Sequence, residues 1–172
     1  MNQRIVSSYA KLLNDLRELT SMAAPGVIGI DGAMQQGKTP LAEQLASDLR
    51  LPVLHLDSYH SGDGPPYVKK LDVDRLRADL QRGMLPASDL ILEGICLLDV
   101  LRIVQTRWKA LIFFIPEPRS IYADFIDPER AEAEVLETLG TSDAAAIDRE
   151  ILNYQRRAKP HEVANILYRA HP

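Results

Sequence analysis

The sequence predicts a three-layer α/β fold, in which a parallel sheet of five strands carries helices on both faces. Two observations support this prediction. Short apolar runs alternate with longer segments whose apolar residues recur every three or four positions, as is typical of buried parallel strands joined by helices. In addition, residues 32–39 read Gly-Ala-Met-Gln-Gln-Gly-Lys-Thr and match the pattern G-x-x-x-x-G-K-[ST] at every fixed position, directly after the first of these runs.

The segments follow one another in the order that such a fold requires. The apolar residues from Val6 to Leu19 share one face of an N-terminal helix, which the turn at 23–26 ends. Five strands are then expected, at 27–31, 53–57, 90–94, 110–115 and 164–168. Numbered one to five along the chain, these strands are expected in the spatial order 2-3-1-4-5. This order brings Asp57, Glu93 and the glycine-rich loop to one carboxyl edge, where open α/β sheets bind ligands.

The glycine-rich loop indicates phosphate binding. Its backbone N–H groups turn inward and the next helix adds its N-terminal dipole, so that Lys38 reaches the outer phosphates of a nucleotide while Thr39 holds Mg²⁺. The residues expected to bind the nucleotide are Gly32, Ala33, Met34, Gln35, Gln36, Gly37, Lys38, Thr39 and Pro40. The alternative, a turn with an incidental lysine, is disfavoured because strand, loop and helix occur in the required order.

Composition limits the class of protein. The 172 residues are 46% hydrophobic and 26% charged, which predicts one globular domain over 1–172. A net charge of −4 gives no sign of a general nucleic-acid or membrane surface, so we expect neither partner. The single cysteine, Cys96, forms no disulfide framework. No apolar stretch reaches the ~18 residues of a membrane span, and we expect a soluble, cytoplasmic protein.

Two carboxylates stand at the ends of apolar runs. Burying an unpaired charge is costly, so Asp57 and Glu93 are expected to face the phosphate site instead of the core. One can accept the proton of an attacking hydroxyl, and the other can hold Mg²⁺ directly or through water. The alternative for each is a carboxylate that caps a helix or a turn. Asp31 is expected to brace the loop.

An acidic, helix-prone region separates the last two strands and is a candidate lid, residues 117–158. From Glu117 to Glu150 it contains ten acidic residues and three arginines. A cationic clamp on the phosphates would therefore depend on Arg149, Arg156 and Arg157. The first lies about two helical turns before the last two, so they can share a face. The alternative is a solvated helix face.

Other polar residues are candidates for substrate binding. Tyr59, His60 and Tyr67 follow Asp57 and could line an acceptor pocket, although His60 fits an exposed loop position equally well. His161 follows Pro160 and either fixes the turn before the last strand or contacts the nucleotide.

At these residues the chain resembles the uridine kinase and phosphoribulokinase-related group of P-loop kinases. Besides the loop, the matching segments are His-Leu-Asp-Ser-Tyr-His at 55–60 and Leu-Glu-Gly-Ile at 92–95, with weaker matches at 71–74 and 156–165. The resemblance implies a P-loop NTPase fold, ATP and Mg²⁺, with Asp57 as the general base and Glu93 as the carboxylate associated with magnesium.

Three features depart from the pattern of that group. Gln35 stands where the loop usually has a third glycine, and Pro40 replaces a residue whose N–H normally helps to bind the α-phosphate. The candidate lid is acidic where that of uridine kinases is rich in arginine.

These observations lead to one function and one alternative. The first is an ATP-dependent, magnesium-dependent kinase that phosphorylates a hydroxyl of a small molecule, such as a nucleoside or another sugar-containing acceptor. The alternative is a nucleotide-binding regulatory or partner-interaction module without efficient phosphoryl transfer. In either case the sequence does not decide whether the protein forms a homo-oligomer.

Overall fold

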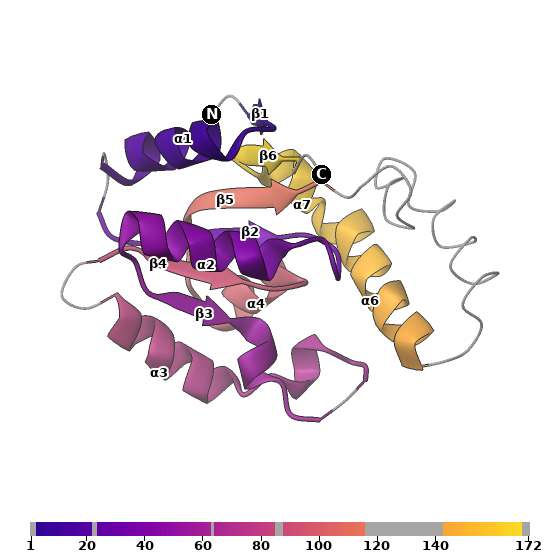
Figure 1. Cartoon of the computed structure of the whole chain (residues 1–172). Coiled ribbons are helices and arrows are strands. Elements are labelled where there is room, and N and C mark those ends of the chain that lie inside the picture. Colours follow the sequence, from indigo (N-terminus) through magenta and orange to yellow (C-terminus); the bar gives the residue numbers. More distant parts are fainter. Residues whose placement is uncertain (1–2, 22–23, 63, 85–87, 116–142, 170–172) are drawn as a thin grey trace.

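The centre of the protein is a sheet of six parallel strands (Figure 1). The structure, a computed structural model, describes residues 3–21, 24–62, 64–84, 88–115 and 143–169. The strands are β1 (Arg4–Val6), β2 (Val27–Asp31), β3 (Val53–His55), β4 (Leu90–Glu93), β5 (Trp108–Phe114) and β6 (Ile166–Tyr168). They lie side by side in the order β1-β6-β5-β2-β4-β3.

The α/β fold and the parallel sheet are confirmed, but the predicted strand count is wrong. The five predicted strands correspond to β2 through β6 and lie in the predicted order relative to one another. The full order differs because β1 adds a sixth strand at the edge beside β6. Val6, which we assigned to the first helix by its apolar spacing, belongs to β1. A strand of three residues is too short to show an alternating pattern, which is why the sequence did not reveal it. That residues 1–172 form one domain stays a prediction.

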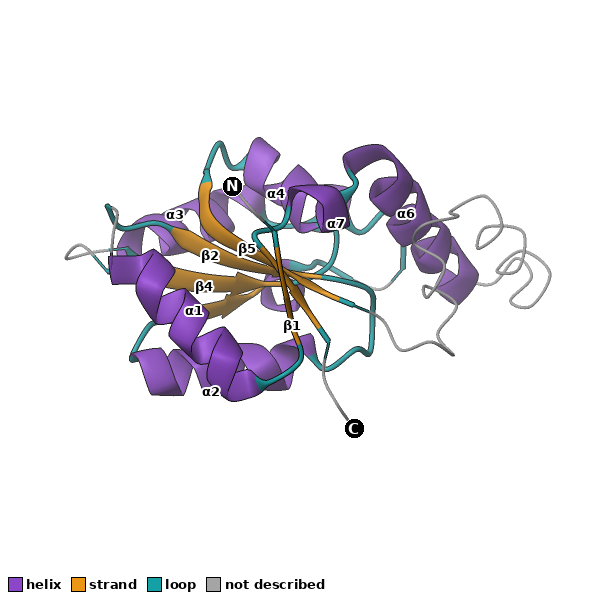
Figure 2. Cartoon of the chain, turned by 90° about the horizontal axis from the view of Figure 1, so that it is seen from above, coloured by secondary structure: helices purple, strands orange, loops and turns teal. Residues whose placement is uncertain are grey.

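Helices cover both faces of the sheet, as the three-layer prediction required (Figure 2). One face carries α1 (Tyr9–Ser21) and α2 (Lys38–Leu49). The other carries α3 (Val73–Gly83), α4 (Leu97–Ile103), α6 (Asp143–Ala158) and α7 (Pro160–Val163). Each face has its own apolar core, because alternate residues of β2 point to opposite sides: Ile28 and Ile30 pack under α1 and α2, and Val27 packs on the other side.

The pairing of the central strands sets the position of the site. Ile30 of β2 is level with Glu93 at the end of β4, and His55 at the end of β3 is level with Glu93 on its other side. The chain leaves β3 into a short 3₁₀ helix, η1 (Leu56–Tyr59), which carries Asp57. The carboxyl ends of β2, β4 and β3 therefore bring the loop, Glu93 and Asp57 to one edge.

Of the candidate lid, the structure describes only the part that forms α6; residues 117–142 lie outside the described residues. No helix in the described ranges is long and apolar enough to cross a membrane.

Candidate active site

The loop between β2 and α2 has the backbone conformation that its glycines permit. Gly37, directly before α2, has φ 87°, and Gly32 has φ 153°. A Cβ atom on Gly32 would lie 3.0 Å from the Phe114 Cβ and 3.1 Å from the Phe114 carbonyl oxygen, so that position also lacks room for a side chain. Gln35 adopts a left-handed φ of 57°, which explains why a glycine is usual there.

Lys38 is the first residue of α2 and lies inside the curve of the loop. Its side chain is buried, and Nζ donates a hydrogen bond to the Ala33 carbonyl oxygen at 2.5 Å. Burial lowers the pKa of the Lys38 ammonium, while the nearby Glu93 and Asp31 carboxylates act in the opposite direction. The ammonium therefore stands in the position from which it can meet a phosphate held by the loop.

Thr39 and Glu93 form a polar corner next to Lys38. The Thr39 hydroxyl donates to Glu93 Oε2 at 3.2 Å, and His55 Nδ1 lies 3.0 Å from the same oxygen. Within the described residues no group of three or more His, Cys, Asp or Glu side chains could hold a metal on its own. One hydroxyl and one carboxylate fit a Mg²⁺ ion, which usually keeps waters and phosphate oxygens as its other ligands.

Asp57 lies on η1, directly after β3, and borders the same cavity as Thr39 and Glu93. Its Oδ1 accepts a hydrogen bond of 2.7 Å from the Tyr67 hydroxyl. The Tyr67 ring stacks on the His60 imidazole, with 4.8 Å between centroids and 16° between planes. Burial and this hydrogen bond raise the pKa of the Tyr67 hydroxyl, so it stays protonated and serves Asp57 as a donor. Tyr67 thus fixes one oxygen of Asp57.

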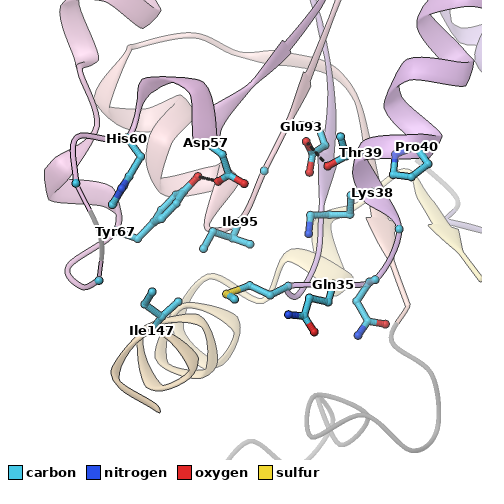
Figure 3. A pocket seen from close by; sticks show the side chains of 16 residues that line it. Gln35, Lys38, Thr39, Pro40, Asp57, His60, Tyr67, Glu93, Ile95 and Ile147 are labelled. Atoms are coloured by element: carbon cyan, nitrogen blue, oxygen red, sulfur yellow. Dashed lines mark hydrogen bonds between the residues drawn. The ribbon is translucent and has the colours of Figure 1, made fainter. Parts of the chain in front are cut away.

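A cavity of about 620 Å³ joins these groups. Figure 3 shows Lys38, Thr39 and Glu93 on one side and Asp57, Tyr67 and His60 on the other. Its lining residues are Met34, Gln35, Gln36, Gly37, Lys38, Thr39, Pro40, Asp57, His60, Gly62, Gly64, Tyr67, Glu93, Gly94, Ile95 and Ile147. The phosphate loop and Asp57 therefore open into the same space. Ile95 and Ile147 are apolar walls that we did not single out from the sequence.

Tyr59 and His161 lie away from this cavity in the structure. The Tyr59 hydroxyl donates to Asp79 at 2.9 Å, its ring lies 5.0 Å from the Arg75 guanidinium, and burial raises its pKa to about 12. The His161 ring packs edge-on against Phe113 at 6.0 Å, and burial lowers its pKa. A role of either residue in substrate binding stays a prediction.

The three arginines of α6 also point elsewhere. Arg157 pairs with Asp99 of α4, with Nη1 at 3.1 Å from Oδ1, and Arg156 donates to Asn153 at 3.4 Å. Arg149 and Arg157 share a face of α6, but that face borders a second cavity. Their part in a phosphate clamp stays a prediction, because it requires a rearrangement that the described structure does not contain.

Two residues of α6 that we missed hold the site together. Glu150 accepts hydrogen bonds from the backbone N–H groups of Tyr67 at 2.7 Å and Val68 at 3.2 Å. Val68 begins the second 3₁₀ helix, η2 (Val68–Lys70), so Glu150 binds the N-terminal end of that helix. One turn further along α6, the Tyr154 hydroxyl donates to Asp31. Their i, i+4 spacing places both on one helix face, but the sequence does not indicate their partners.

Asp31 connects Tyr154 to the phosphate loop. It is fully buried at the end of β2, and its Oδ1 accepts from the Gly32 N–H at 2.8 Å. The Tyr154 hydroxyl also accepts from the Leu98 N–H at 3.2 Å, which joins α4 to the same network. Burial raises the pKa of Asp31 to about 6, while its hydrogen bond to Tyr154 acts in the opposite direction.

Comparison with known proteins supports the fold. No protein-family model and no curated protein matches the chain. Among solved structures, a possible uridine kinase from Bacillus stearothermophilus is 18% identical, with a TM-score of 0.60, over 93% of this chain and 96% of that one. A gluconokinase from Sinorhizobium meliloti 1021 is 18% identical, with a TM-score of 0.46, over 86% and 85% of the two chains. The first of these two likenesses shows that the chain has a uridine kinase-like P-loop kinase fold.

Proposed function

We propose that this protein is an ATP-dependent phosphotransferase that phosphorylates a hydroxyl group of a small molecule. The observation that carries the proposal is the shared cavity of about 620 Å³. On one side of it lies the glycine-rich loop with the buried Lys38, and on the other lies the Asp57 carboxylate. Phosphoryl transfer needs mainly positioning and charge neutralisation, and these groups supply both.

The loop and Lys38 would bind the phosphates of ATP. The left-handed conformation of Gly37 turns the loop into the start of α2, where free N–H groups and the helix dipole favour an anion. Thr39 and Glu93 would hold Mg²⁺, which would offset the negative charge of the phosphates. Lys38 is already oriented into the loop, so its charge acts in a site shielded from water.

Asp57 would act as the general base. It takes the proton of the acceptor hydroxyl, whose oxygen then forms a bond to the γ-phosphorus as the bond to the ADP oxygen breaks. Tyr67 holds Oδ1 of Asp57, which leaves Oδ2 for the acceptor proton. The stacked rings of His60 and Tyr67 border the cavity beside Asp57 and suit an acceptor with a flat or sugar-like face.

A lid over residues 117–158, with Arg149, Arg156 and Arg157 as a phosphate clamp and His161 near the nucleotide, is part of the same proposal. It requires Arg157 to exchange Asp99 for a phosphate. The second candidate function, a nucleotide-binding module without transfer, is favoured by this pairing of Arg157 and by Pro40, which has no N–H for the α-phosphate.

A screen for acceptor-dependent ATP consumption tests the proposal. Purified protein with Mg-ATP is offered a library of nucleosides, sugars and other hydroxylated metabolites, and ADP release is measured for each. We expect at least one acceptor to increase ADP release, and Asp57→Asn to lower kcat on it by about 10²–10⁴-fold with little change in ATP affinity. ATP binding without turnover on any acceptor would favour the module, and full activity of Asp57→Asn would disprove the assigned base.

A further inference from the structure

The Glu93 carboxylate is held by two hydrogen-bond donors that reach the same oxygen. His55 Nδ1 lies 3.0 Å from Oε2, and the Thr39 hydroxyl donates to Oε2 at 3.2 Å (Figure 3). Within the described residues, no hydrogen bond reaches the other oxygen, Oε1. The two oxygens of this carboxylate therefore differ: Oε2 is fixed by the protein, and Oε1 is left for a ligand.

The sheet places His55 beside Glu93. The two residues are paired in register at the ends of the neighbouring parallel strands β3 and β4. Two residues earlier in these strands, Val53 and Ile91 pack in the core under α1 and α2. Because side chains alternate across a strand, His55 and Glu93 point to this same face, where Thr39 lies in the first turn of α2.

His55 contacts Glu93 from outside the cavity. Glu93 and Thr39 are among the described residues that line the cavity of about 620 Å³, and His55 is not. An ionised carboxylate has no hydrogen to donate, so the imidazole is the donor and carries a proton at Nδ1. The role that this position allows is therefore to orient the carboxylate, without contact between His55 and a ligand in the cavity.

We propose that His55 is a positioning residue for the magnesium site: it fixes Oε2 of Glu93 and so leaves Oε1 to hold Mg²⁺ directly or through water. The inference rests on the proposed function, in which the metal binds together with a nucleotide. Loss of a side chain that orients a metal ligand typically lowers metal affinity by about 10–100-fold. Thr39 is itself an expected metal ligand, so His55 is the donor that lies outside the metal site.

Calorimetry separates this role from a merely structural one. A non-hydrolysable ATP analogue is titrated into the protein, once with Mg²⁺ and once with a chelator. We expect Mg²⁺ to raise the affinity of the wild type for the analogue. His55→Phe should reduce this gain at least tenfold and leave the metal-free affinity nearly unchanged. His55→Asn keeps an amide N–H close to the position of Nδ1 and should restore most of the gain.

Two more variants serve as controls. Tyr9→Phe removes a hydroxyl that donates at 2.6 Å to Asp48, a carboxylate of α2 outside the cavity, and should leave the gain unchanged. His55→Ala, at a side chain that is 25% exposed, repeats the test without a large ring in case the phenylalanine disturbs folding. It should lose the gain as His55→Phe does.

The possible results distinguish this inference from the proposed function. An unchanged gain in His55→Phe and His55→Ala would refute the role of His55 and leave the proposed function intact, and so would an equal loss in Tyr9→Phe. An equal fall of the affinities with and without Mg²⁺ would show a structural role only. A loss in His55→Asn as large as in His55→Phe would also overturn the inference, and nitrogen coupling in the pulsed EPR spectrum of bound Mn²⁺ would then identify His55 as a direct ligand. A wild type that binds no analogue, or binds it without any effect of Mg²⁺, would contradict the proposed site itself.

Discussion

Tyr154 gives a direct test of how α6 supports the phosphate loop. Tyr154→Phe keeps the ring, which is 3% exposed, and removes only the hydroxyl that donates to Asp31 and accepts from the Leu98 N–H. A hydrogen bond to a charged group contributes about 1.5–3 kcal/mol, and a buried N–H without a partner costs about 1–3 kcal/mol. Because the two effects share one atom and do not add fully, we expect the free energy of unfolding to fall by about 3 kcal/mol. For a chain of this length, Tm should fall by about 6–12 °C.

The pH dependence distinguishes this hydrogen bond from a general loss of packing. Burial raises the pKa of Asp31 from its usual value of 3.8 to about 6. Between these values the folded state keeps a proton that the unfolded state has lost, so this group lowers stability as the pH rises. The hydrogen bond from Tyr154 lowers the pKa of Asp31, so the pKa of Asp31 should be higher in the variant. The fall in stability with rising pH should therefore extend to higher pH in the variant than in the wild type. The stability difference between wild type and variant should therefore grow from pH 4 to pH 8 in denaturant unfolding.

Tyr168→Phe is the matched control. Tyr168 is a buried tyrosine of β6, and its ring packs edge-on against Phe114, a contact that phenylalanine keeps. In the described part of the chain its hydroxyl has no hydrogen-bond partner, so we expect a loss below about 1 kcal/mol at every pH. If Tyr154→Phe costs no more than the control, or costs the same at pH 4 and pH 8, the hydroxyl does not hold a charged Asp31 and our reasoning is refuted.

Three further variants separate the parts of the proposed site. Lys38→Ala should weaken Mg-ATP binding by about 100-fold in calorimetry, since it removes a charged partner of the phosphates, and unchanged affinity would disprove the phosphate-loop assignment. Tyr67→Phe should lower kcat about tenfold with ATP affinity unchanged, because it frees Asp57 from its 2.7 Å hydrogen bond; an equal change in ATP affinity would indicate a wider disturbance. Arg156→Gln with Arg157→Gln should lower kcat more than it raises the KM of the acceptor, and wild-type turnover would remove both arginines from the clamp.

The layers of the fold could be predicted because burial leaves a strong mark on the sequence. Strands covered on both faces are continuously apolar, as in β2, β4 and β5, and the helices between them repeat every three to four residues. The edge strand β1 has no such mark. Its pattern of one buried residue, Val6, next to the 72% exposed Ile5 is too short to distinguish from the start of a helix.

The residues of the candidate site likewise include some that the sequence predicts and others that it does not. Lys38, Thr39, Asp57 and Glu93 each follow a local pattern, and parallel strand pairing brings such patterns to one edge. Glu150 and Tyr154 have no local pattern, because their partners lie 83 and 123 residues away and are set by how α6 packs on the site. The same packing turns Arg149 and Arg157 toward the second cavity, which their spacing on the helix could not reveal.

The two departures in the loop affect phosphate binding and leave the fold intact. A non-glycine residue in the left-handed region costs about 1–2 kcal/mol, but glycine at position 35 would lose more conformational freedom on folding, so Gln35 changes stability little. Pro40 is the third residue of α2, where N–H groups have no partner within the helix. The first backbone hydrogen bond of the helix starts one residue after Pro40, where the Leu41 N–H donates to the Gly37 carbonyl oxygen at 3.2 Å. What Pro40 removes is therefore a donor to the phosphate, and the difference from a standard loop should appear in nucleotide affinity rather than in stability.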